Sequence, residues 1–183
     1  MTLYTTLDSP LGPLLLVGER SATAPGGTAL ASLSVPGQKR GAVVQADWTH
    51  DPAAFTGIAR RLTAYFDGAR EPFTVECVPR GTDFQQRVWA ALEAVPYGTT
   101  TTYGAIAAAI GAPRGAVRAI GTAIGANPLL VVRPCHRVIG ADGSLTGYAG
   151  GLDRKRLLLD LEGTAPASPR DRAPHPVRAS TPR

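Results

Sequence analysis

The chain contains 183 residues, of which 44% are hydrophobic and 18% are charged. A chain of this length and composition can bury one core or two small ones, which excludes a protein that is disordered throughout. Its formal net charge is +5, but four arginines and one aspartate give residues 164–183 a charge of +3. The rest of the chain is only mildly basic, so charge alone does not identify a nucleic-acid partner.

Cysteine and histidine usage indicates the redox setting and the absence of a metal. Cys77 and Cys135 are the only cysteines, and no apolar signal segment begins the chain. This pattern argues against a disulfide framework and predicts a reducing, cytoplasmic setting. His50, His136 and His175 lack the spacing of metal ligands, so we expect no metal and no other cofactor. No apolar run is long enough to cross a bilayer, and we expect no membrane partner.

The first 80 residues have the pattern of an α/β scaffold domain. One helix is predicted from Pro52 to Phe66, because apolar side chains recur there at helical spacing after a proline in the first turn. No set of polar residues converges in this half, which favours a structural role. Strands are predicted at residues 3–7, 14–17, 29–35 and 73–78.

The pattern changes from strands to helices near Gly81, which we interpret as a domain boundary. Thr82 and Gln85 have the spacing of a capping box at the start of a helix. Two short helices across a tight connection have the proportions of a helix-turn-helix, and a last helix completes a second domain over residues 81–163. These three helices are predicted at residues 103–110, 115–126 and 153–162. The Pro- and Arg-rich tail, residues 164–183, is predicted to be disordered.

The sequence PCHRV, residues 134–138, places a thiol beside an imidazole and a guanidinium. A thiol attacks only as the thiolate, and a neighbouring cationic or hydrogen-bonding group lowers its pKa. Cys135 is therefore a candidate nucleophile. Taken alone, a single cysteine is more often inert filling of a core.

This motif resembles the signature of the O6-alkylguanine-DNA alkyltransferases, also called methylated-DNA-protein-cysteine methyltransferases. The resemblance covers most of the chain, because NP at residues 127–128, YAGG at 148–151 and TTLDSPLG at 5–12 also match the family. It implies an α+β fold. The N-terminal α/β domain would be RNase H-like with a short antiparallel sheet, and the mainly helical C-terminal domain would carry a winged-helix-like helix-turn-helix.

The resemblance also implies the activity and the partner. Family members bind double-stranded DNA in the minor groove and flip out O6-alkylguanine. They transfer the alkyl group irreversibly to a cysteine, here Cys135, in a single turnover, and O4-alkylthymine is a second expected substrate. We expect a monomer, with cooperative binding along DNA left open.

Residue roles follow from the same resemblance. His136 would activate Cys135 through a water, Glu162 would orient the imidazole, and Asn127 would tie the DNA-reading helix to the cysteine. Tyr103 would press on a phosphate and donate to the base. The substrate pocket would be lined by Tyr103, Val138, Tyr148 and Ala149.

The DNA-reading helix would contribute Arg118, inserted in place of the flipped base, and Thr122. The stretch at residues 113–118 is one residue longer than is usual in the family, so Arg114 is an alternative inserted group. We expect Arg114 to meet a phosphate instead. Small residues at Gly147 and Ala149 predict room around the alkyl group, whereas Thr146 would narrow it, so the range of adduct sizes is left open.

Arg133 stands before the motif where the family usually has an aliphatic residue. An unpaired buried arginine would be costly, so we expect its side chain to point to solvent or to a DNA phosphate.

Two other classes of function fit parts of the sequence. A cysteine hydrolase or thiol transferase using Cys135 and His136 would turn over many times. A DNA-lesion sensor of the same fold would bind without repair, but such relatives lack the nucleophilic cysteine. The sequence therefore favours the self-alkylating repair protein.

Overall fold

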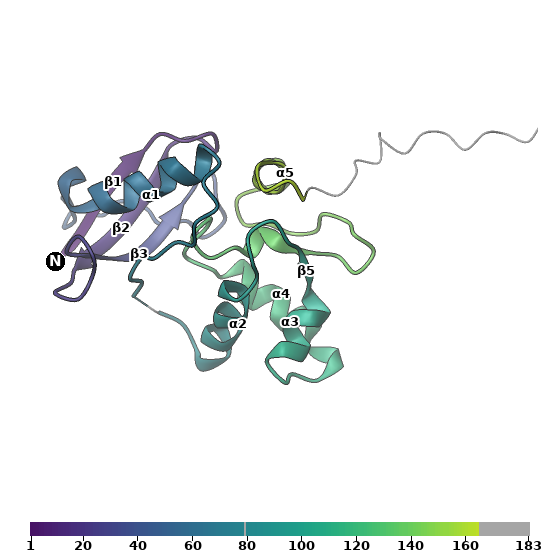
Figure 1. Cartoon of the computed structure of the whole chain (residues 1–183). Coiled ribbons are helices and arrows are strands. Elements are labelled where there is room, and N and C mark those ends of the chain that lie inside the picture. Colours follow the sequence, from purple (N-terminus) through teal and green to yellow (C-terminus); the bar gives the residue numbers. More distant parts are fainter. Residues whose placement is uncertain (79, 165–183) are drawn as a thin grey trace, which may run out of the picture.

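The computed structural model describes residues 1–78 and 80–164, and Figure 1 shows a small sheet with one helix beside a group of helices. The sheet has the order β3-β2-β1-β4. Strands β1 and β2 are antiparallel, with Leu7 opposite Leu14, as are β2 and β3, whereas β4 runs parallel to β1. The strands are β1 (Thr2–Leu7), β2 (Leu14–Arg20), β3 (Thr28–Ser34) and β4 (Thr49–His50).

One helix covers this sheet, as the apolar spacing predicts. A 3-10 turn, Pro52–Phe55, leads directly into α1 (Thr56–Phe66). The Asp51 carboxylate caps the turn by accepting a hydrogen bond from the Ala54 amide at 3.2 Å. Phe55, Ile58, Leu62 and Tyr65 are buried, so one face of the helix belongs to the core.

The prediction of a strand at residues 73–78 is wrong. This segment makes a single bridge to β3, in which Leu30 donates to the Glu76 carbonyl at 2.8 Å and accepts from Val78 at 2.9 Å. Farther along the same edge, Leu33 donates to the Pro128 carbonyl at 2.8 Å and accepts from Leu130 at 3.1 Å. Residues 73–75 make no backbone hydrogen bond to β3, and residues 128–130 bind the edge at Leu33, beyond this bridge, so the segment pairs with the sheet at one point only.

The C-terminal half is mainly helical. The capping box of Thr82 and Gln85 starts α2, and α3 and α4 form the expected helix-turn-helix pair, with α2 and α3 both packed on α4. Two short parallel strands, β5 and β6, were not predicted. The elements are α2 (Asp83–Glu93), β5 (Thr101–Thr102), α3 (Tyr103–Ala109), a 3-10 turn (Arg114–Ala116), α4 (Val117–Gly125), a 3-10 turn (Cys135–Arg137), β6 (Val138–Ile139) and α5 (Leu152–Leu161).

Buried apolar side chains from both halves form one continuous cluster, so the α+β architecture is held together across the sheet edge. The Arg154 guanidinium on α5 reinforces this connection by donating to the Leu11 carbonyl at 2.8 Å. No helix in the described part of the chain is long and apolar enough to span a membrane. The predicted disordered tail lies outside the described residues from position 165 onward.

Candidate active site

Cys135 lies on a tight turn that begins at the edge of β3. Within this turn Arg133 donates to the Leu129 carbonyl at 2.9 Å, and Cys135 donates to the Arg133 carbonyl at 2.7 Å. Val131 has a φ of 69°, a left-handed conformation that is strained for a β-branched residue. Such strain persists only where surrounding contacts fix the backbone, so the position of the thiol is strongly determined.

Asn127 fixes the thiol to the C-terminal end of α4. Its side-chain nitrogen donates to Sγ of Cys135 at 3.2 Å, to the Arg133 carbonyl at 3.1 Å and to the Leu129 carbonyl at 3.3 Å. Its side-chain oxygen accepts from the Leu129 amide at 3.0 Å. The structure thus brings Asn127 and Cys135 together as the resemblance implies.

The electrostatic surroundings of Cys135 differ from those suggested by its sequence neighbours. Burial raises the pKa of the thiol, whereas the hydrogen bond from Asn127 and the charges of Lys155 and Arg133 lower it. The balance leaves the pKa above its ordinary value in the free protein. Arg137, two residues after the cysteine, points to Glu162 instead of the thiol. The cations near the thiol are therefore Lys155 and Arg133, and not the arginine of the motif.

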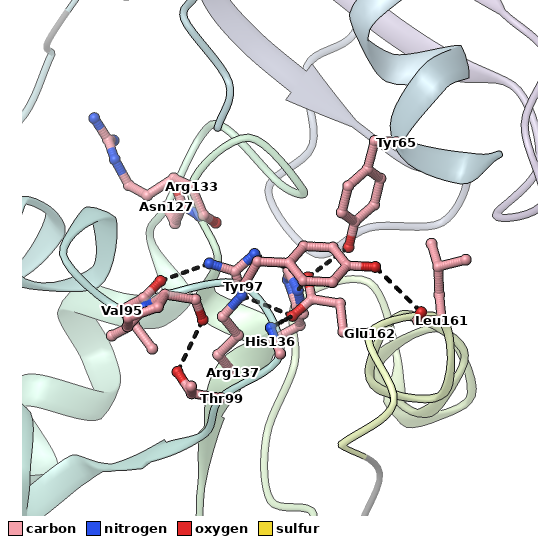
Figure 2. A network of polar contacts seen from close by, with 12 residues as sticks. Tyr65, Val95, Tyr97, Thr99, Asn127, Arg133, His136, Arg137, Leu161 and Glu162 are labelled. Atoms are coloured by element: carbon pink, nitrogen blue, oxygen red, sulfur yellow. Dashed lines mark hydrogen bonds and ion pairs between the residues drawn. The ribbon is translucent and has the colours of Figure 1, made fainter. Parts of the chain in front are cut away.

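Figure 2 shows the buried polar network around Glu162. Its Oε1 accepts from Nε2 of His136 at 2.8 Å and from the Tyr65 hydroxyl at 2.7 Å. Two nitrogens of Arg137 donate to the carboxylate at 2.8 and 2.9 Å, and the Gly98 amide donates at 3.3 Å. Burial alone would raise the pKa of Glu162, but the hydrogen bonds from His136 and Arg137 outweigh it and lower the pKa to about 2.

The ionised Glu162 determines which nitrogen of His136 carries the proton. A carboxylate only accepts hydrogen bonds, so Nε2 is the protonated nitrogen and Nδ1 carries a lone pair. Burial lowers the pKa of His136 despite the opposing effect of Glu162, which keeps the ring neutral at neutral pH. Within the described residues, Nδ1 is buried and makes no hydrogen bond. This nitrogen is therefore available to take up a proton.

A cavity of about 300 Å³ opens beside the thiol. The predicted pocket residues Tyr103, Tyr148 and Ala149 line it with Cys135. Val138 is absent from its walls, and the Val138 carbonyl instead accepts a hydrogen bond from Lys155 at 2.6 Å. The remaining walls come mainly from small residues of α4 and from the loop after β3: Lys39, Arg40, Gly121, Thr122, Ile124, Gly125 and Gly147.

The Tyr103 hydroxyl donates to the Thr146 carbonyl at 3.0 Å, so it already bridges α3 and the opposite wall of this cavity. To contact a base or a phosphate, as the resemblance implies, the hydroxyl must exchange this bond for one to DNA. Thr146, which is expected to narrow the pocket, thus also contacts Tyr103 through its backbone carbonyl.

The exposed face of α4 consists largely of small side chains, while Ile120, Ala123 and Ile124 are buried. Arg118 and Thr122 lie on the exposed face, where the Thr122 hydroxyl donates to the Arg118 carbonyl at 3.1 Å. The helix can therefore approach another surface closely. The backbone of Arg114 lies in the preceding 3-10 turn, but its side chain lies outside the described part of the structure.

The expectation that Arg133 points to solvent or DNA is wrong. Its side chain is only 7% exposed and pairs with Glu93 on α2 at 2.7 Å. Its guanidinium also lies over the Trp89 ring, 4.9 Å from the ring centre. The ion pair and the cation–π contact offset the free-energy cost of burying the guanidinium, which an unpaired arginine could not avoid.

Several residues near the site were not identified from the sequence. Tyr65 fits the apolar spacing of α1, which conceals its hydroxyl contact with Glu162. Lys155 is fully buried, and its ammonium donates to the carbonyls of Val138, Thr146 and Gly147 at 2.6, 2.8 and 3.2 Å. A lysine in an amphipathic helix is normally exposed, so no local pattern distinguishes this one.

The hydrogen bonds of Asn127 lead to a stability prediction. Asn127→Ala removes a fully hydrogen-bonded buried amide and leaves the Leu129 amide and two carbonyls with fewer partners. We expect the free energy of unfolding to fall by about 2–4 kcal/mol, measured by urea denaturation. Thr122→Ala on the exposed face of α4 is the control and should change it by less than about 0.5 kcal/mol. Equal stability of the Asn127→Ala and unchanged proteins would mean that other contacts hold the turn.

The chain matches two family models that together span nearly all of the described residues. The model of the 6-O-methylguanine DNA methyltransferase ribonuclease-like domain matches residues 2–79. The model of the DNA binding domain of the same family matches residues 83–164.

Individual proteins give the same result. The chain is 53% identical to the methylated-DNA–protein-cysteine methyltransferase of Mycobacterium bovis, over 90% of this chain and 94% of that protein. It is 47% identical to the Methanosarcina barkeri protein of the same name, over 87% and 96%. Its structure resembles that of Mycobacterium tuberculosis OGT in complex with DNA, with a TM-score of 0.80 and 52% identity over 88% of this chain and 93% of that one. The chain therefore belongs to the 6-O-methylguanine DNA methyltransferase family.

Proposed function

We propose that this protein repairs DNA by direct reversal, transferring the alkyl group from O6 of guanine to Sγ of Cys135. The observation that carries the proposal is the position of this thiol. It lies in the wall of a cavity with two tyrosines, bound by Asn127, on the turn that also carries a neutral His136 fixed by Glu162.

The reaction forms one carbon–sulfur bond and breaks the bond between the alkyl carbon and O6. The thiol proton passes to Nδ1 of His136, by way of a water as the family resemblance implies, and Glu162 stabilises the resulting imidazolium. The departing guanine takes up a proton, for which the Tyr103 hydroxyl at the cavity wall is the proposed donor. Because a thioether does not release the group, each protein molecule reacts once.

The proposed DNA interface is the exposed face of α4, which would enter the minor groove. Its small side chains favour a close approach, and Arg118 is a long cation that can occupy the space of a flipped base. Thr122 lies one turn farther along the same face, and Arg114 is proposed to meet a phosphate. The solved complex of the Mycobacterium tuberculosis protein with DNA supports DNA as the partner.

We assign residues 1–80 to the scaffold and residues 81–163 to DNA binding and alkyl acceptance. The two family models meet close to this boundary. We further propose that the protein acts as a monomer in the cytoplasm, where both of its free thiols would stay reduced.

The stoichiometry of repair tests this proposal against a hydrolase that uses the same thiol and imidazole. Excess duplex DNA containing O6-methylguanine is incubated with a known amount of protein, and the repaired guanines are counted. We expect the count to stop at one per protein molecule. Continued release beyond one would contradict the proposal and favour a turnover enzyme.

A further inference from the structure

The buried Arg133 joins the turn that carries Cys135 to helix α2. Its Nε donates to Glu93 at 2.7 Å, and its guanidinium stacks on Trp89, which lies one turn earlier on the same helix. Arg133 is also part of the turn itself, because its carbonyl accepts hydrogen bonds from Asn127 and from the Cys135 amide. Its side chain and backbone therefore contact two different elements.

Helix α2 continues this connection to the DNA-reading helix. The Trp89 ring nitrogen donates to the Ala123 carbonyl on α4 at 2.9 Å. The same indole thus contacts α4 through its nitrogen and Arg133 through its ring face. Asn127 provides a second connection between α4 and the turn, since it follows α4 and binds Sγ of Cys135. The acceptor turn and the DNA-reading helix are consequently held at a fixed distance by two routes.

We propose that Arg133 is a positioning residue for alkyl transfer, setting the Cys135 turn relative to the helix that reads DNA through its contacts with Glu93 and Trp89. This inference rests on the proposed function, because it concerns the position of the same thiol relative to the alkyl group that it would attack. The buried guanidinium of Arg133 is also a positive charge near the thiol. Small displacements of a reacting atom reduce rates strongly, which gives such a residue a large effect without contact with substrate.

Arg133→Met tests this role. Methionine keeps an unbranched stem against Trp89 but removes the charge and the bond to Glu93. At saturating duplex DNA, the single-turnover rate constant should fall by about tenfold or more. It should fall by a similar factor for the free O6-methylguanine base, since the defect lies in the thiol and not in flipping. The dissociation constant for DNA should change less than about twofold, since Arg133 makes no DNA contact.

Two further variants separate positioning from loss of folded protein. Arg133→Lys restores the charge without the planar stack, so the pH–rate profile should return to that of the unchanged protein, whereas in Arg133→Met it should move to higher pH. Arg20→Met removes an exposed arginine that pairs with Asp51 at 2.8 Å and should change neither rate nor profile.

The inference is overturned if Arg133→Met keeps its rate and its pH profile, or if only the fraction of reactive molecules falls while their rate constant is unchanged. Failure of the unchanged protein to accept a methyl group would instead refute the proposed function itself. The two failures are distinguishable because the unchanged protein is measured in the same experiment.

Discussion

Replacing Glu162 with glutamine will destabilise the protein and slow alkyl transfer together. The substitution is nearly isosteric, but it leaves the buried Arg137 without its carboxylate partner. Removing one partner of a buried ion pair costs roughly 3–5 kcal/mol of unfolding free energy. The neutral amide also stabilises a protonated His136 less well, so the single-turnover rate should fall by at least about 10²-fold. Urea denaturation and single-turnover kinetics at pH 7 measure the two effects.

The pH dependence of stability distinguishes the charge of Glu162 from its shape. In the folded protein the pKa of this carboxyl is lowered from 4.5 to about 2, so the folded state favours the ionised form. Its contribution is fully present above pH 4.5 and is lost as the pH falls toward 2. The unchanged protein should lose stability over this range more steeply than Glu162→Gln. Asp160→Asn, an exposed acid on the same helix, should leave the curve unchanged. Parallel curves for Glu162→Gln and the unchanged protein would contradict the assignment.

Removing the Arg118 side chain will impair repair of duplex DNA selectively. If Arg118 fills the space of the flipped nucleotide, its loss removes compensation for unstacking, which is worth a few kcal/mol. Arg118→Ala should therefore slow transfer from duplex DNA by about 10–10²-fold. Transfer from the free O6-methylguanine base needs no flipping and should be nearly unaffected. Comparing single-turnover rates on the two substrates measures the difference.

Arg114→Ala is the matched control, because Arg114 lies in the 3-10 turn that leads into α4, four positions before Arg118. A phosphate contact contributes binding free energy independently of sequence, so this variant should bind all duplexes more weakly and show a smaller salt dependence. The opposite outcome, with duplex repair surviving loss of Arg118 and failing with loss of Arg114, would identify Arg114 as the inserted residue.

Features that depend on local sequence were predicted correctly. The capping box at Thr82 starts α2, and the apolar spacing after Pro52 forms a helix against the sheet. The helix-turn-helix pair follows from breaks at Gly111 and Pro113. Such signals lie within a few residues of the structure that they determine. The PCHRV motif likewise carried the family resemblance, and the family models and the relatives confirm it.

Features that depend on distant partners were not predicted. Residues 73–78 have strand composition, yet they meet β3 at a single bridge between Cys77 and Leu30. Arg133 finds its ion-pair partner in Glu93, which is 40 positions away in the sequence. Lys155 is buried because three backbone carbonyls converge on its ammonium. The residues next to Arg133 and Lys155 in the sequence do not reveal these distant partners. Composition alone therefore predicts that both charged side chains are exposed to solvent.

The identity of the acceptor atom is the central claim, and the mass of the intact protein tests it most directly. After incubation with duplex DNA containing O6-methylguanine, the protein should gain the mass of one methyl group. Peptide mapping should place that group on Cys135, and Cys135→Ser should gain nothing. Cys77 is the internal control, because its thiol donates to the Val75 carbonyl at 3.4 Å and does not line the cavity beside Cys135. Methylation of Cys77, or repair of O6-methylguanine with no gain of mass at Cys135, would contradict the account.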